Sequence, residues 1–127
     1  MIGYVTLGVS DIARAQAFYD ALLGSVGATR LMEDPEYNGY TMYGTGLADP
    51  CLAITRPFDG RPASAGNGTM VALHRPSRAE VDAFHAKALE LGGQDEGAPG
   101  QRTPTFYGAY VRDLDGNKLC AFVTGPA

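Results

Sequence analysis

The sequence predicts an α+β fold: two β-α-β-β-β modules that form a curved mixed sheet with a concave face for a ligand. Three observations support this class. Strand-like alternation and helical periodicity follow one another along the chain, the same order recurs after a linker, and 127 residues with 45% apolar side chains can bury one sizeable core. We expect a single domain, with module one at residues 1–58, a linker at 59–68 and module two at 69–127.

The first module opens with a strand, because apolar and polar residues alternate from Tyr4 to Val9. A helix is expected from Asp11 to Leu23, since apolar side chains recur there at helical spacing, and Ser10 is the expected N-cap. The remaining strands of this module are expected at Thr29 to Met32, Tyr37 to Gly44 and Cys51 to Arg56.

The second module starts with a strand from Thr69 to His74. The segment Ser77 to Glu80 is a capping box, which predicts a helix from Arg78 to about Leu91. A Gly/Pro-rich loop at Gly97 to Gly100 then leads to a closing hairpin around Asp113-Leu114-Asp115-Gly116-Asn117. We expect the Asp and Asn side chains to form this turn and not a calcium loop, because the closing Glu of an EF-hand is absent.

An internal repeat relates the modules. Matched positions include Val5 and Val71, Phe18 and Phe84, and Gly27 and Gly93. With a shift of one residue, Tyr40 matches Tyr107 and Tyr43 matches Tyr110. A nearly constant offset favours a true repeat over chance similarity. Tyrosines three apart on a strand point to opposite faces, so one of each pair faces the ligand side, and which one stays open.

Composition excludes several classes of protein. The net charge is -4 and the basic residues are scattered, which argues against a nucleic-acid partner. The N-terminal residues lack the features of a signal peptide, and no apolar run reaches the roughly 18 residues of a membrane span. We therefore expect a cytoplasmic protein without a membrane partner, in which Cys51 and Cys120 are reduced.

Short motifs in both modules resemble the vicinal oxygen chelate superfamily, the glyoxalase, bleomycin resistance and extradiol dioxygenase group. They are Val5 to Asp11, then Arg14, Phe18-Tyr19 and the turn at Asp113 to Asn117, together with the repeated module. The resemblance covers nearly the whole chain and implies a glyoxalase-like fold and a homodimer. In metal-dependent members, it implies one divalent metal ion on the concave face, held by His and Glu from the first and last strands of each module.

The metal ligands of that family are missing here. The two histidine positions hold Tyr4 and Met70, and the glutamate position holds Cys120. In the last strand of module one, Ala53 or Ile54 stands where a further ligand would be. A phenol, a thioether and a thiol do not make a normal site for a hard cation. The resemblance thus implies a member with no metal and no cofactor.

We expect the protein to bind a small organic molecule in an aromatic-lined cup. The expected ligand-binding residues are Tyr4, Met70, Cys120, Phe122, Tyr40, Tyr107, Tyr110 and Arg56. No catalytic residue is assigned. A nucleophilic Cys120 would need a nearby base, and His74 lies four residues along its strand from Met70, which shares the family's metal-ligand positions with Cys120. A Cys-His pair is therefore not implied. Two alternatives stay open: a glyoxalase-like lyase, isomerase or dioxygenase with a non-standard site, and a structural dimerisation module.

Overall fold

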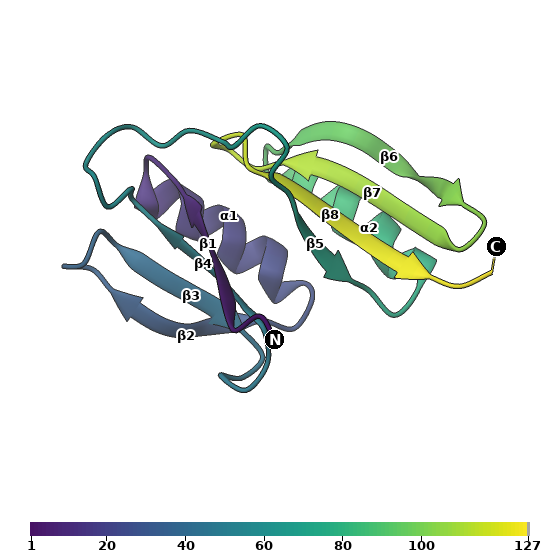
Figure 1. Cartoon of the computed structure of the whole chain (residues 1–127), viewed down its shortest axis with the longest axis horizontal. Helices are drawn as coiled ribbons and strands as arrows, with labels where there is room; N and C mark the ends of the chain where they lie inside the picture. Colours follow the sequence, from purple (N-terminus) through teal and green to yellow (C-terminus); the bar gives the residue numbers. More distant parts are fainter. Residues whose placement is uncertain (127) are drawn as a thin grey trace. The chain divides into compact units, whose positions relative to one another are not determined.

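The computed structural model describes residues 1–126, which divide into two compact units, one of residues 1–65 and the other of residues 66–126. Each unit combines one four-stranded mixed sheet with one helix (Figure 1). Both units follow the order β-α-β-β-β, which confirms the predicted α+β class and the repeat of the module. The strands divide into two sheets, one in each unit.

The first unit has a sheet in the order β1-β4-β3-β2, in which β1 is parallel to β4 and the other pairs are antiparallel. Its elements are β1 (Tyr4–Gly8), α1 (Ile12–Gly24), β2 (Thr29–Asp34), β3 (Tyr40–Gly44) and β4 (Cys51–Thr55). The predicted N-cap is one residue too early: the extended residue Asp11 caps α1 and accepts a hydrogen bond from the Arg14 backbone N–H at 3.0 Å.

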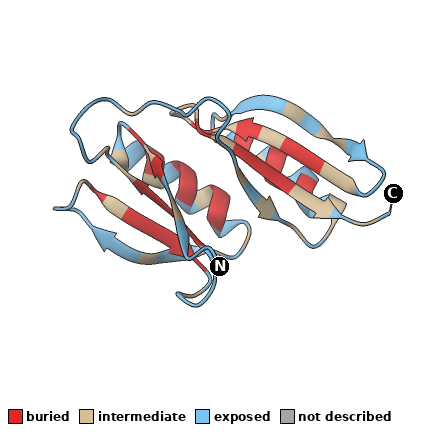
Figure 2. Cartoon of the chain, viewed as in Figure 1, coloured by how far each residue is buried: buried red, intermediate tan, exposed pale blue. Residues whose placement is uncertain are grey.

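The core of the first unit lies between α1 and one face of its sheet. Phe18, Tyr19 and Leu22 of α1 are buried, as are Leu7 of β1 and Ile54 of β4 (Figure 2). Burying each large apolar side chain contributes about 1.5–3 kcal/mol. This packing fixes which sheet face is covered by the helix and leaves the opposite face for other partners.

The second unit has the sheet order β5-β8-β7-β6, with β5 parallel to β8. Its elements are β5 (Val71–His74), α2 (Arg78–Glu90), β6 (Gln94–Thr103), β7 (Phe106–Arg112) and β8 (Lys118–Thr124). The capping box is confirmed, because the Glu80 backbone N–H donates to the Ser77 hydroxyl at 3.2 Å. Buried His85 of α2 lies 3.0 Å from the Asp95 carboxylate and so connects the helix to β6.

The prediction of a loop at Gly97 to Gly100 is wrong, because this stretch belongs to the edge strand β6. The pairing of β6 with β7 shifts register on both sides of Gly97, as bulges do. Pro99 is tolerated there, since an edge strand can lack one N–H without breaking a ladder between two neighbours. The Gly and Pro residues therefore bend a strand and do not end it.

The turn between β7 and β8 is built by Asp113, as predicted. Its carboxylate accepts hydrogen bonds from the backbone N–H groups of Asp115 at 2.9 Å and Asn117 at 2.8 Å, and from the Asn117 side chain at 2.9 Å. Gly116 has a φ of 87°, which glycine adopts at little cost. This turn fixes the register of the closing hairpin.

Candidate functional site

In each unit, the helix covers one face of the sheet, and the opposite face is called the free face below. Strand pairing assigns residues to the free face of the second unit. Tyr110 of β7 lies opposite Cys120 of β8, and Ala72 of β5 lies on the other side of Cys120. Phe122 follows two residues later on the same face. The structure thus brings three predicted residues together: Tyr110, Cys120 and Phe122.

An aromatic row, His74–Phe122–Phe106, crosses this free face. The Phe106 and Phe122 rings stack with centroids 5.2 Å apart and planes 8° apart. The His74 ring meets Phe122 edge-on, at 5.5 Å. Gly108 makes this possible, because a Cβ there would lie 2.7 Å from a Phe106 ring carbon. The row is a ready stacking surface for another flat ring.

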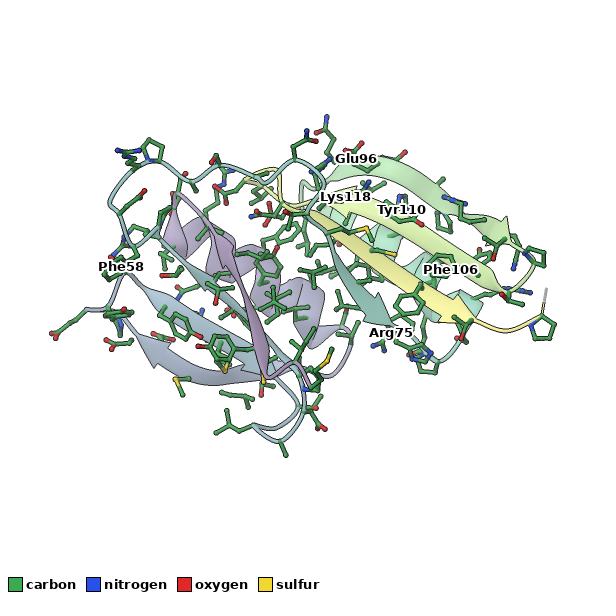
Figure 3. The ribbon with its side chains drawn as sticks, viewed as in Figure 1. Phe58, Arg75, Glu96, Phe106, Tyr110 and Lys118 are labelled. Carbon is green, nitrogen blue, oxygen red and sulfur yellow. The ribbon has the colours of Figure 1, made fainter. Side chains whose placement is uncertain are left out.

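Tyr110 continues the free face beyond the aromatic row, with Lys118 close by (Figure 3). Two cations contact its ring. The Arg102 guanidinium carbon lies 5.5 Å from the ring centroid, and the Lys118 ammonium lies 5.3 Å from it. They come from β6 and β8, the strands on either side of β7. Cations above an aromatic ring are held by its quadrupole.

Cys120 is fully buried beneath this surface. Burial raises the pKa of its thiol, and the nearby Lys118 and Arg102 charges only partly oppose that effect. The thiolate is the nucleophilic form of cysteine, so a raised pKa makes Cys120 a poor nucleophile at neutral pH. Its place is in the packing under the free face.

The free face of the first unit is more aliphatic. Met42, Cys51 and Ala53 form a buried cluster with Tyr40 packed against it, and Tyr4 at the start of β1 is 57% exposed. Met70, which precedes β5 in the second unit, is 43% exposed. Tyr4, Tyr40 and Met70 are therefore accessible to different degrees, and none of them belongs to the aromatic row.

Strand register decides the question that the paired tyrosines left open. Tyr43 and Tyr107 both face their own helix: the Tyr43 hydroxyl donates to Asp20 of α1 at 2.7 Å, and the Tyr107 hydroxyl donates to Asp82 of α2 at 2.6 Å. Tyr40 and Tyr110 lie on the free faces. The placement of Tyr107 corrects its assignment to the ligand side.

The sequence match between the tyrosines fails for a simple reason. The connection from β3 to β4 is one residue longer than the connection from β7 to β8. Met42, which pairs with Ala53, is therefore the counterpart of Tyr110, which pairs with Cys120. The numbering difference that relates equivalent residues of β4 and β8 is therefore one residue too small for β3 and β7.

Arg56 also lies apart from the aromatic row. It lines an open hollow of about 580 Å³ in the first unit, beside the start of α1 and the turn from β2 to β3. Asp11 and Glu33 line the same hollow, so carboxylates oppose an anionic ligand there. The other predicted ligand-binding residues are not part of its lining, and we place the candidate site on the free face of the second unit.

The residues at the family's metal-ligand positions do not fit a metal ion. Ala53 is on the free face beside Thr6 and Met42, whereas Ile54 faces the helix, so the first-unit position has no donor atom. Cys120 is buried as a thiol. Among residues 1–126, no group of three or more His, Cys, Asp or Glu side chains is arranged to hold a metal ion.

Phe106, His74, Arg102 and Lys118 are site residues that sequence reasoning missed. The signal for Phe106 was present: a short turn at Asp113 to Asn117 sets Tyr110 opposite Cys120, and alternation then places Phe106 on the same face. Arg102 could not be found in this way, because the bulges in β6 interrupt the alternation.

Solved structures of several proteins resemble this chain. A glyoxalase/bleomycin resistance protein from Albidiferax ferrireducens is 36% identical, with 98% of this chain and 99% of that chain covered and a TM-score of 0.86. A glyoxalase-related enzyme from Fulvimarina pelagi is 20% identical, with coverage of 98% and 88% and a TM-score of 0.76, and shares the fold. TnmS3, an antibiotic binding protein from a Streptomyces species, is 25% identical, with coverage of 98% and 96% and a TM-score of 0.70.

A match to a family model identifies the family of this chain. No curated protein matches the chain. Within residues 1–126, neither helix has the length and apolar character needed to cross a membrane. The model of the Glyoxalase/Bleomycin resistance protein/Dioxygenase superfamily matches residues 1–121. With this match and the fold and motifs described above, the chain belongs to the glyoxalase/bleomycin resistance protein/dioxygenase superfamily.

Proposed function

We propose that this protein binds a small organic molecule on the free face of its second unit, without a metal ion. The observation that carries this proposal is the aromatic row, with Tyr110 next to it. His74 is exposed, and Phe106, Phe122 and Tyr110 are half-buried, so their rings can contact a ligand. Stacking on such rings is worth about 0.5–1.5 kcal/mol per pair beyond the buried area.

The chemistry of the surrounding residues supports binding over metal-based catalysis. Tyr4, Ala53 and Met70 offer no set of donors for a hard cation at the family's ligand positions. Cys120 is a buried thiol with a raised pKa, which disfavours covalent chemistry. A site of aromatic and apolar groups can instead hold an organic ligand by stacking and by excluding water.

A similar protein of solved structure, whose ligand is an antibiotic, also supports binding of a small organic molecule. TnmS3, which is 25% identical over 98% of this chain, is an antibiotic binding protein. Binding of an antibiotic or a similarly sized aromatic compound is one form that the proposed function takes. We also propose that the protein is a cytoplasmic homodimer with modules at residues 1–58 and 69–127, and that Tyr4, Tyr40 and Met70 add to the ligand surface.

A thermal-shift screen of aromatic compounds on chelator-treated full chain tests the proposal. A ligand at about 100 times its Kd should stabilise the folded state by about 2.7 kcal/mol and raise Tm. Phe122→Ala should remove this shift, because it takes away the central ring of the aromatic row. Phe58→Ala is the matched control, since Phe58 is 84% exposed and follows β4 in the first unit.

Two results would contradict the proposal. One is a set of compounds that raise Tm only after the protein has been loaded with Zn²⁺, Ni²⁺, Mn²⁺ or Fe²⁺. The other is a ligand-induced shift that persists in full in Phe122→Ala, because the aromatic row would then not be the binding surface. Circular dichroism of each variant without ligand checks that the fold is retained.

A further inference from the structure

We infer that the free face of the second unit selects a planar aromatic anion, such as an aromatic carboxylate or sulfonate. This inference rests on the proposed function and names its ligand class. The aromatic row provides the apolar half of the surface, and the two cations at Tyr110 provide the charged half. A ligand that carries a flat ring and an acidic group matches both halves.

The charge on this face differs in sign from that of the whole chain. The chain has a net charge of -4, yet Arg102, Arg112 and Lys118 lie around Tyr110. Arg112 is neutralised by Glu96 at 2.6 Å. Within the part of the chain that the structure describes, neither Arg102 nor Lys118 forms an ion pair. Two positive charges are therefore left for an outside anion.

Two glycines leave room for the Arg102 guanidinium beside Tyr110, and the guanidinium donates a hydrogen bond to the Ala98 carbonyl. A Cβ at Gly100 would lie 2.6 Å from a terminal nitrogen of Arg102, and a Cβ at Gly97 would lie 2.9 Å from the Tyr110 ring. The bulges of β6 around Gly97 bring these positions next to β7. Larger residues at either glycine would displace the guanidinium or the ring, so the local sequence places a cation on this face.

The spacing of the two halves suits a ligand of two or three fused rings. The pair of Tyr110 and Cys120 lies two residues along the strands from the pair of Gly108 and Phe122, which corresponds to about 7 Å. A fused bicyclic ring stacked on Phe122 can thus direct its acidic group toward Lys118 and Arg102. Charge-assisted hydrogen bonds to an anion are about twice as strong as neutral ones.

Calorimetric titration of the full chain with two matched probes tests this inference. The probes are naphthalene carboxylate and the neutral naphthalene carboxamide, which share a ring and differ in charge. We expect the carboxylate to bind about tenfold more tightly, which corresponds to about 1.4 kcal/mol. Added salt should weaken carboxylate binding and leave carboxamide binding nearly unchanged, because salt screens exposed charges.

Charge-removing variants locate the effect. Lys118→Gln and Arg102→Gln should each reduce the preference for the carboxylate, and the double variant should abolish it while keeping carboxamide affinity. Lys87→Gln is the matched control, because Lys87 lies on α2 and pairs with Glu90 at 3.7 Å. It should leave both affinities unchanged.

The outcomes separate this inference from the proposed function. Equal affinities for the two probes, or a carboxylate preference that survives in the double variant, would overturn the selection of an anion and leave metal-free ligand binding intact. If neither naphthalene probe binds and no compound of the thermal-shift screen binds, the inference and the proposed function both fail. Binding of the carboxylate that depends on Lys118 and Arg102 supports both.

Discussion

Single residues decide which side of each sheet a ligand can reach. The Tyr43 hydroxyl is held by Asp20, and desolvation is the main reason that the pKa of Tyr43 is raised. The hydrogen bond to Asp82 is the main reason that the pKa of Tyr107 is raised. Both phenols therefore stay neutral at physiological pH and act as donors that tie a strand to its helix. Tyr110 has no such role and is left on the free face.

At the residue scale, two glycines with different backbone conformations provide a matched test. Gly116→Ala should destabilise the fold by about 1 kcal/mol, because φ is 87° at this position and a Cβ disfavours that region. Gly24→Ala, at the end of α1 with no atom near the added Cβ, should be neutral or slightly stabilising. Urea unfolding measures both, and equal effects of the two variants would show that the turn is not under this constraint.

A second test at this scale concerns the carboxylate of the turn. Asp113→Ala removes an acceptor for two backbone N–H groups and one side-chain N–H group, and Asp113 is only 5% exposed. Leaving such donors unsatisfied should cost about 1–3 kcal/mol. The expected result is a lower urea midpoint with an unchanged m-value; an unchanged midpoint would mean that water replaces the carboxylate at no cost.

At the scale of elements, α2 is connected to β6 by the pair of His85 and Asp95. The His85 side chain is the main cause that lowers the pKa of the Asp95 carboxyl below its ordinary value of 3.8, and the Gly97 backbone N–H adds to the effect. A carboxyl with a lowered folded-state pKa contributes stability above its unfolded-state pKa, and this contribution is lost as pH falls through the folded-state pKa. The pair should therefore stabilise the second unit at neutral pH.

This sign gives a pH-dependent prediction. Asp95→Asn should destabilise the protein at neutral pH, and the difference from the wild type should shrink as the pH falls through the lowered folded-state pKa of Asp95. Denaturant unfolding across this range measures the effect, and Asp59→Asn in the exposed linker is the control. A difference that stays constant down to the lowest pH would show that the carboxylate charge plays no part.

Elements with strong local signals could be predicted from the sequence. The capping box at Ser77 and the turn at Asp113 depend on neighbouring residues alone, and both were predicted correctly. The edge strand β6 was not, because its Gly and Pro residues favour loops unless a neighbouring strand pairs with them. Tertiary pairing with β7 overrides the local preference.

At the scale of the whole molecule, the family was evident from short motifs in order, but the site was only partly evident. The sequence placed Phe122 on the same face as Cys120 and named Tyr110 as a candidate, but only the strand register shows that Tyr110 lies opposite Cys120. It did not identify the stacking of Phe106 on Phe122, which requires both the register of the hairpin and the missing side chain at Gly108. Contacts of this kind depend on three-dimensional packing and have no signature in a single stretch of residues.

Metal-free ligand binding is tested most directly by calorimetric titration of naphthalene carboxylate into the full chain after exhaustive chelation. We expect the same Kd before chelation, after chelation and after addition of Zn²⁺, because the proposed contacts to the ligand come from rings and cations of the second unit and not from a metal ion. Metal analysis of the same samples should show no correlation between metal content and affinity. Binding that is lost on chelation and restored by one metal ion per chain would contradict a metal-independent site.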